Sequence, residues 1–345
     1  MRTDTPVKTA SGTFRPPIPF GSRRGSADSS RRHQPAVVAV FFSLLSAIAG
    51  ATPADCNEAV EPRFSVTMDS DGILVQENDR PVLRYQTAVQ SKDGRWPRNN
   101  YVHPVYDLDG NVITEDFPVD HGHHRGIFWA WHQVLVDGKP MGDSWVCEDF
   151  EWDLESRAAK LDHDKVTLSA AVLWKSPALV DDDGRQVPFV REATTITVHA
   201  QKDERRFVDF RITLQPLFDD VQIGGSPDEK GYGGFSPRIR LSDRTTFVGP
   251  AGEVEPQITS IEAGPWMDIA SDQGGVTMVS HSGNPGFPEP WILRRESSMQ
   301  NAAWPGREPV RLSKDHPPTL RYRLVIHRGP ASYEQLRNGT KISKN

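Results

Sequence analysis

Cysteine is scarce in this chain of 345 residues, which contains only Cys56 and Cys147. Two cysteines can form neither a zinc ribbon nor a disulfide scaffold, so both classes of small domain are excluded. An oxidising compartment would permit a disulfide between them. They are 91 residues apart, and the sequence leaves open whether they pair.

Helical patterning is also scarce. The one modest helix candidate is "SYEQLRNG", a short turn that ends at Gly339. Gly and Pro number 27 and 28, which indicates many turns and little long helix. The uncharged apolar run Ala36–Ala51 is shorter than the roughly 20 residues of a membrane-spanning helix.

The first 51 residues have the organisation of a signal peptide. Residues 1–35 carry seven Lys/Arg and two Asp/Glu, and the apolar run that follows ends in Ala49-Gly50-Ala51, an A-x-A cleavage pattern. We therefore expect a signal peptide over 1–51, a linker over 52–62, and a periplasmic or secreted protein with no stable membrane span after cleavage. Removing a charge of +5 from the net −6 leaves −11. So acidic a chain argues against nucleic acid and anionic membranes as partners.

Period-two alternation dominates from Phe64 onward. Apolar residues share one face at Val166, Leu168, Ala170, Val172 and Trp174, and again at Leu320, Tyr322, Leu324 and Ile326. The segment "TTITVHAQKDERRFVDFRITLQPL" predicts a hairpin that turns at Lys-Asp-Glu. Many half-buried strands predict an all-β fold, a large antiparallel β-sandwich formed as one domain over 63–335, with a tail at 336–345.

Four of the eleven histidines lie in "FPVDHGHHRGIFWAWHQV", residues 117–134. Asp120, His121, His123 and His124 could ligate a divalent metal, with His121, His123 and His124 as its core, or exchange protons near neutral pH. The spacing fits no H-x₃-H or HExxH template, so no cofactor is predicted, although a metal remains possible. A third interpretation is that these histidines are structural and that hydrogen bonds satisfy their ring nitrogens.

Other candidate residues surround this motif in long polar loops. Trp129 and Trp131 would face the same way on a strand and could serve as sugar platforms, unless they are core. Glu192, at the start of a strand, could be the carboxylate partner of a histidine acid. The remaining candidates for holding a substrate are His103, Arg125, Lys230, Arg238, His281 and Asn284.

The succession "YVHPVYDLDGNVITEDFPVDHGHHRGIFWAW", "REATT", "KGYGGFSPR", "HSGNPGFPEPW" and "LRYRLVIHRG" resembles the PmoA-like family, labelled methane oxygenase PmoA. The resemblance covers roughly residues 60–335. It implies a galactose-mutarotase-like β-supersandwich, a fold associated with sugar epimerases, lyases and glycosidases. It further implies His123 or His124 as acid and Glu192 as base. Arg125, His103, Lys230, Arg238 and His281 would then fix the sugar.

Taken together, these patterns predict an exported carbohydrate-active isomerase, lyase or hydrolase that acts on a small molecule or an oligosaccharide. Two alternatives remain open at this point. One is a metal-dependent oxidoreductase with histidine ligands, and the other is a sugar-binding module without catalysis.

Overall fold

The computed structural model describes residues 63–329, all of which fall within one compact unit. These residues form strands, turns and loops, with no helix among them. It follows that the described part contains no helix able to cross a membrane. The predicted all-β class is confirmed.

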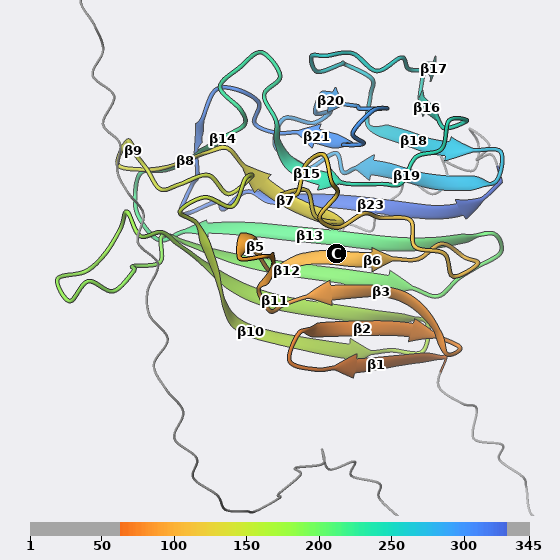
Figure 1. The fold of residues 1–345 in the computed structure, drawn as a ribbon, viewed down its shortest axis with the longest axis horizontal. Helices are drawn as coiled ribbons and strands as arrows, with labels where there is room; N and C mark the ends of the chain where they lie inside the picture. Colours follow the sequence, from red (N-terminus) through yellow and green to blue (C-terminus); the bar gives the residue numbers. More distant parts are fainter. Residues whose placement is uncertain (1–62, 330–345) are drawn as a thin grey trace, which may run out of the picture. The chain divides into compact units, whose positions relative to one another are not determined.

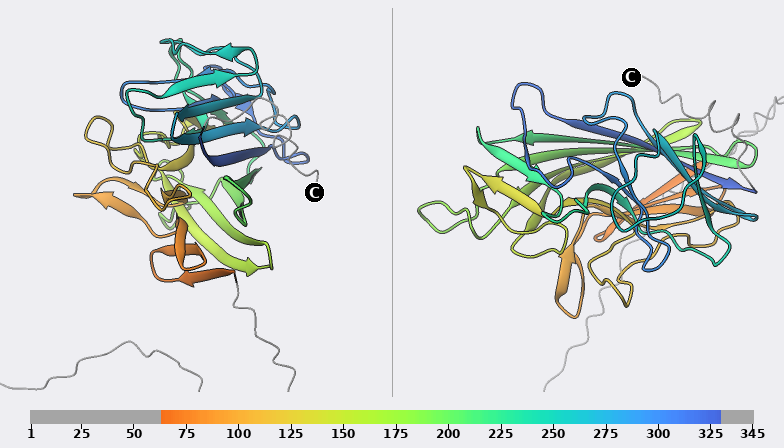
Figure 2. Two further views of the ribbon diagram at one scale, coloured as in Figure 1. Left: turned by 90° about the vertical axis from the view of Figure 1, so that its right-hand side faces the viewer. Right: turned by 90° about the horizontal axis from the view of Figure 1, so that it is seen from above.

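Two large antiparallel sheets make the two layers of the sandwich (Figures 1 and 2). In spatial order, the eight-stranded sheet consists of β1 (Phe64–Met68), β2 (Gly72–Glu77), β3 (Arg80–Gln86), β6 (Tyr101–Val105), β7 (Ile127–Trp131), β15 (Gly233–Pro237), β21 (Asn301–Ala303) and β20 (Trp291–Ile292).

The nine-stranded sheet carries the longest strands. Its spatial order is β10 (Glu151–Leu161), β11 (Lys165–Lys175), β12 (Val190–His199), β13 (Arg205–Pro216), β23 (Thr319–Arg328), β19 (Gly274–Ser280), β18 (Trp266–Ser271), β16 (Thr246–Gly249) and β17 (Gly252–Glu253).

Two small sheets complete the described residues. One has the order β22 (Val310–Arg311), β14 (Val221–Gly224), β8 (Gln133–Val136) and β9 (Lys139–Pro140). The other is the hairpin of β4 (Gln90–Lys92) and β5 (Arg95–Arg98).

The expected alternation matches the observed burial. In β11 the apolar face from Val166 to Trp174 is buried, and in β23 the face from Leu320 to Ile326 is buried. The predicted hairpin is β12–β13, in which Ile196 pairs with Phe210. Its turn is closed by a hydrogen bond from the Lys202 amide to the Arg205 carbonyl (2.9 Å).

The strand β7 separates the core from the opposite face of its sheet, because successive side chains point to opposite faces. Trp129 and Trp131 are buried in the main core between the two large sheets. Phe128 and Ala130 belong instead to a separate cluster that includes Trp145. Phe128 and the residues that pack on it are therefore held outside the main core.

Several predictions fall on residues that are not described. They are the signal peptide over 1–51, the linker, Cys56 and the short helix near the C-terminus. Cys147 is described, and it is a free, buried thiol.

Candidate functional site

Four imidazoles gather on the face of β7 that points away from the core. We call this group the histidine patch and define it as His121, His123, His124 and His132, together with Asp120, Asp143 and Arg238. The ring of His124 lies 6.2 Å from Phe128 and 6.0 Å from Trp145, measured between centroids. The patch therefore rests on the aromatic cluster of the outer face.

A tight turn brings the first three rings together. The His124 amide donates to the His121 carbonyl at 2.9 Å, which folds the segment back on itself. His121 and His124 stack with centroids 4.8 Å apart, and His123 stands edge-on to His124 at 4.5 Å. The rings of His121, His123 and His124 therefore converge at this turn.

Gly122 is required in this turn because Trp96 of β5 lies directly against it. A Cβ on Gly122 would lie only 2.1 Å from the Trp96 ring. Trp96 is half-buried and packs against the edge of the core. The contact of Trp96 with the histidine turn depends on the β4–β5 hairpin and was not predicted from the sequence.

We expect Gly122→Ala to lower the free energy of unfolding by about 1–3 kcal/mol, because the added methyl group overpacks against the indole. Denaturant unfolding measures the loss. In a Trp96→Ala background the same substitution should cost much less, because the clash has been removed. Equal costs in both backgrounds would show that Trp96 does not constrain the turn.

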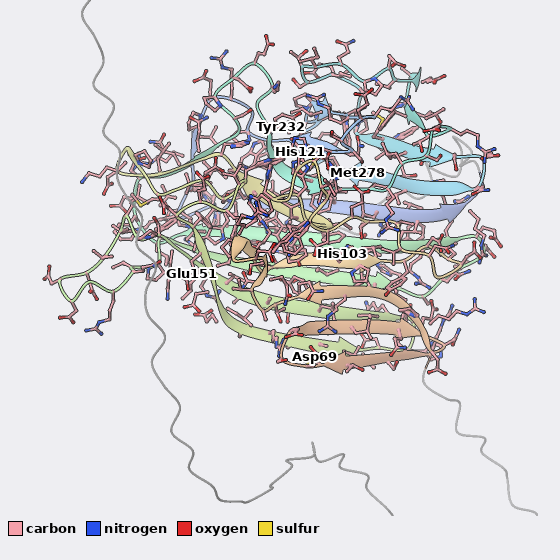
Figure 3. All side chains as sticks on the ribbon, in the orientation of Figure 1. Asp69, His103, His121, Glu151, Tyr232 and Met278 are labelled. Atoms are coloured by element: carbon pink, nitrogen blue, oxygen red, sulfur yellow. The ribbon has the colours of Figure 1, made fainter. Side chains whose placement is uncertain are left out.

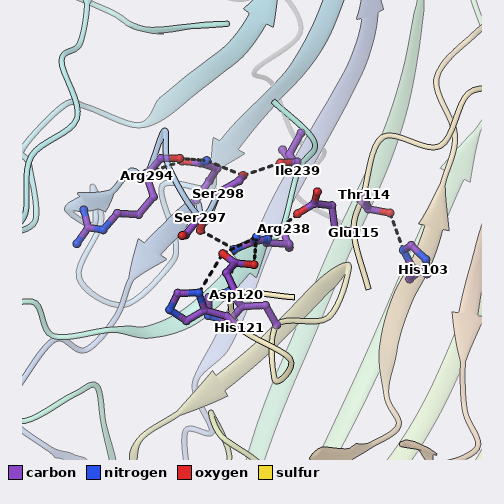
Figure 4. A network of polar contacts seen from close by, with 12 residues as sticks. His103, Thr114, Glu115, Asp120, His121, Arg238, Ile239, Arg294, Ser297 and Ser298 are labelled. Carbon is purple, nitrogen blue, oxygen red and sulfur yellow. Dashed lines mark hydrogen bonds and ion pairs between the residues drawn. The ribbon is translucent and has the colours of Figure 1, made fainter. Parts of the chain in front are cut away.

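Within the histidine patch, Arg238 holds Asp120 and His124 in place. It follows β15, and its amide donates to the Gly126 carbonyl at 2.6 Å. The buried guanidinium donates to both oxygens of Asp120 (2.9 and 3.0 Å) and to Glu115 (2.8 Å). Its remaining nitrogen lies 3.2 Å from Nδ1 of His124 and 2.5 Å from the Ser297 carbonyl (Figure 4).

This arrangement sets the tautomer of His124. A guanidinium can only donate, so Nδ1 of His124 accepts and the ring proton resides on Nε2. Burial and the neighbouring His123 and Arg238 lower the pKa of His124 far below its ordinary range. His124 is therefore a neutral, rigidly oriented imidazole at physiological pH.

His123 differs from its neighbours, because its ring makes no hydrogen bond to any described residue. It is partly exposed, and burial together with His121, Arg98 and His132 lowers its pKa to about 4. The ring is thus neutral at pH 7 and keeps a free lone pair. Among the four imidazoles of the patch, His123 is the one best placed to accept a proton from a ligand.

The two flanking histidines each bind an aspartate. Nδ1 of His121 donates to Asp120 at 3.1 Å, and Nδ1 of His132 donates to Asp143 at 2.8 Å. Asp143 also accepts from the amides of Trp145 and Val146 (2.8 and 3.1 Å). Asp120 therefore fixes the orientation of the His121 ring, and Asp143 that of the His132 ring. In each ring the bond uses Nδ1, so Nε2 points away from the aspartate.

Sequence reasoning missed His132 and Asp143. His132 lies within the histidine-rich segment 117–134, but its partner Asp143 comes eleven positions later, in the loop after β9. A second missed contact is Tyr232, whose ring lies 5.5 Å from that of Trp145 and whose hydroxyl accepts from Arg294 at 2.8 Å. The β8–β9 hairpin brings Asp143 back to His132, and the pairing of β7 with β15 in the eight-stranded sheet places the loop of Tyr232 beside Trp145. No pattern in the sequence indicates these contacts.

Arg125 does not face a ligand. It is fully buried, and its guanidinium binds Asp116, the hydroxyl of Tyr101 and the carbonyls of Gln90 and Trp96. These carbonyls belong to β4 and β5. The expected substrate-binding role of Arg125 is therefore replaced by one of holding the hairpin against the histidine turn.

Glu192, expected to serve as a catalytic carboxylate, is placed in the core. It is fully buried and accepts hydrogen bonds from Trp129 (2.6 Å), Trp174 (2.9 Å), Thr194 (2.7 Å) and Asn100 (2.8 Å). Since Trp129 points into the core and the histidines lie on the other face, β7 separates Glu192 from the patch. The structure therefore does not bring the expected His–Glu pair together.

The same burial corrects the interpretation of Trp129 and Trp131 as sugar platforms. They are 1% and 0% exposed, and the indole of Trp131 donates to the Trp304 carbonyl at 2.8 Å. Neither ring presents a face to solvent. The aromatic side chains near the patch are Trp145, Phe128, Tyr232 and Trp96 instead.

The remaining candidates lie apart from the histidines. His103, on β6, binds Thr114 at 2.9 Å, and Figure 4 shows Arg238 and Glu115 between it and the Asp120–His121 pair. Burial lowers the pKa of His103. Figure 3 shows the places of His103 and His121 on the sandwich.

Lys230, His281 and Asn284 sit in the other two polar loops. Lys230 is paired with Asp228 of its own loop at 3.7 Å. Nδ1 of His281 accepts from the Gly283 amide, so this ring organises its own turn. Asn284 is buried and binds Ser280, Glu289 and both backbone groups of Arg321. None of these contacts reaches the histidine patch.

The three clustered histidines are not arranged as metal ligands. No group of three or more His, Cys, Asp or Glu side chains in residues 63–329 has a geometry that could hold a metal ion. The His121 and His124 rings are stacked, and Nδ1 of His124 is occupied by Arg238. A shared coordination point would require these rings to turn, so we derive no step through a metal.

Two hollows lie elsewhere on the molecule. One, of about 450 Å³, is lined by Arg63, Glu77, Gln201 and Arg206 among others, and one of about 230 Å³ is lined by Ile239, Val276 and His327 among others. In the first, Glu77 is already bound by Arg63 and Arg206. Neither hollow is lined by a residue of the histidine patch.

The fold and the patch define a class: an antiparallel β-sandwich that carries a histidine-rich polar site on the outer face of one sheet. The chain belongs to a family of unknown function, DUF6807, whose model matches residues 72–340. No curated protein matches the chain. The family description assigns no activity, and it does not carry the PmoA label.

Proposed function

We propose that this protein is an exported enzyme that transfers protons to and from a sugar, with His123 as the general base. The observation that carries the proposal is the neutral ring of His123, which makes no hydrogen bond to a described residue and lies beside His121, whose ring Asp120 holds, and His124, whose ring Arg238 holds. A general base must be unprotonated at the working pH and must have an accessible lone pair, and the partly exposed ring of His123 meets both conditions. A sugar is proposed as substrate because the sequence resemblance implies a mutarotase-like supersandwich, a fold associated with sugar enzymes.

Both carboxylates of the patch, Asp120 and Asp143, are already engaged by other protein groups, which favours epimerase or lyase chemistry over hydrolysis. Glycosidases generally use two carboxyl groups that flank the scissile bond. Here Asp120 is held by Arg238 and His121, and Asp143 is held by His132 and two amides. Proton abstraction from carbon, or transfer between hydroxyl and ring oxygen, needs only the imidazoles.

The test is a panel of mono- and oligosaccharides incubated in D₂O and followed by NMR for deuterium incorporation and new products. His123→Gln should slow turnover by about a hundredfold, at the lower end of general-base effects. Its stability should change by less than about 0.5 kcal/mol, because the ring is partly exposed and loses no hydrogen bond to a described residue.

His163→Gln is the matched control, since His163 is exposed in the turn between β10 and β11. It should retain full activity. Sugar binding without any turnover would identify a non-catalytic binding module instead. Turnover that is unchanged in His123→Gln would refute the assignment of the base.

A further inference from the structure

The larger of the two hollows lies at one end of the sandwich, where turns from both layers meet. Strands β2, β6 and β12 all end on the right-hand side of Figure 1, and residues that follow them line the hollow. β2 and β6 belong to the eight-stranded sheet, and β12 belongs to the nine-stranded sheet. The volume of about 450 Å³ falls within the range of small-molecule sites, roughly 300–1,000 Å³. Its size and its place on a rigid scaffold therefore suit a small ligand.

A buried ion pair between the two sheets forms one wall of this hollow. Glu77 is 3% exposed and Arg206 is 5% exposed. The two oxygens of Glu77 accept from Arg63, from Arg206 and from the Gln201 amide (3.1 and 3.2 Å). Arg206 reaches Glu77 through Nη2, its Nε is buried without an acceptor, and its Nη1 makes no hydrogen bond within residues 63–329. The wall is thus held in place and still has a donor for a ligand.

Three exposed side chains at the hollow have polar groups that no other described residue binds. They are the guanidinium of Arg80, the carboxylate of Asp203 and the side-chain amide of Asn78. The carboxylate of Asp107 differs, because it accepts from the amides of Asp109 and Asn111 and from the Asn111 side chain. The groups that remain open therefore include both donors and acceptors.

The charges that line the hollow are balanced. The charged lining residues are Arg63, Arg80, Arg206, Glu77, Asp107 and Asp203, which give three guanidiniums and three carboxylates. The lining as a whole therefore has no excess charge to attract a ligand of one sign. Pro81 and Leu108 are the only larger apolar residues of the lining, so an apolar ligand would find little surface to bury. A hydroxyl group fits both kinds of open group, because it can accept from a guanidinium and donate to a carboxylate.

We propose that this hollow binds a neutral polyhydroxylated ligand, either a free sugar or a segment of a glycan, at a site separate from the histidine patch. Arg80 and Nη1 of Arg206 donate to its hydroxyl oxygens, and Asp203 accepts from its hydroxyls. The inference does not depend on the proposed function, because no residue of the histidine patch lines the hollow.

The test is an NMR titration of the native chain, followed at the backbone amides of Asn78, Gly110 and Gln201. The probes are glucose, galactose, xylose, cellobiose and maltose, with glucuronate and glucosamine as charged counterparts. At least one neutral sugar should give saturable shifts at these amides and should bind more tightly than its charged counterparts. Tighter binding of a disaccharide than of its monosaccharide indicates a glycan segment, whereas equal affinity indicates that a single ring is held.

Arg80→Ala and Asp203→Asn should each weaken this binding severalfold, because each removes a hydrogen bond to the ligand. Both side chains are exposed, and asparagine tolerates the positive φ of residue 203, so both variants should fold normally. Arg244→Ala is the matched control, since Arg244 is an exposed arginine that does not line the hollow. It should leave the affinity unchanged, and so should His123→Gln.

Three results would overturn the proposal. They are the lack of saturable shifts at the three amides with every neutral sugar, tighter binding of glucuronate or glucosamine, and affinity that neither Arg80→Ala nor Asp203→Asn alters. Shifts confined to the histidine patch would remove the site in the hollow and leave the proposed function intact. Conversely, binding in the hollow without any turnover by His123 would leave this site in place and remove the proposed enzyme.

Discussion

Replacing Glu192 by alanine is expected to lower the free energy of unfolding by about 4 kcal/mol, because the change leaves buried donors unsatisfied and also opens a cavity. Four donors converge on this carboxylate, from Trp129, Trp174, Thr194 and Asn100. They come from both large sheets, so the loss weakens the contact between the two layers. Urea unfolding of both proteins measures the difference.

Glu192→Gln is the matched variant, because it keeps the volume and one acceptor oxygen. It should cost less than half as much as alanine. A loss of under 1 kcal/mol for Glu192→Ala would contradict the role assigned to this carboxylate as the common acceptor.

The pH dependence of stability provides an independent check on Glu192. Burial raises its pKa above the ordinary 4.5, and the four donors oppose that shift without cancelling it. The folded state therefore holds this proton more tightly than the unfolded state. The stabilisation is complete below pH 4.5 and is lost as the pH rises through the folded pKa. Glu192→Gln should remove this component of the pH profile.

The strands of the fold could be predicted because their signal is local. Alternation in β11, β12, β13 and β23 identified the buried faces, and the same rule already contained the correct position of Glu192. Glu192 is in phase with Ile196 and Val198, both buried, so the alternation places its side chain in the core. Its chemical type suggested catalysis, and the alternation was the better guide.

The candidate site was predictable only in part. The turn from Asp120 to His124 is local, so the sequence already showed that its three histidines lie close together. The contacts that define its chemistry are long-range: Arg238 is 118 positions from Asp120, and Tyr232 lies on the loop before β15. These pairings depend on β7 and β15 being neighbours in the sheet, which no local pattern encodes.

Replacing Arg238 by alanine is expected to cost about 3 kcal/mol of stability, at the lower end of the range for breaking a buried ion pair. The lower end applies because Asp120 and Glu115 each remain about one-third exposed, so water partly compensates them when the guanidinium is lost. Circular dichroism during denaturant unfolding measures the change.

The effect of Arg238 on activity should be larger than the effect on folding alone, since this side chain positions the patch without touching the proposed substrate. Without it, Asp120 loses both anchoring bonds and Nδ1 of His124 loses the donor that fixes its tautomer. Arg238→Lys keeps the charge but cannot bridge Asp120, Glu115 and His124 at once. We therefore expect Arg238→Lys to fold with most of its stability and yet show weakened turnover.

¹⁵N chemical shifts of His124 should report a mixture of tautomers. If Arg238→Lys kept the wild-type ¹⁵N shifts of His124 and the wild-type turnover, the guanidinium of Arg238 would not be needed to position the histidine patch.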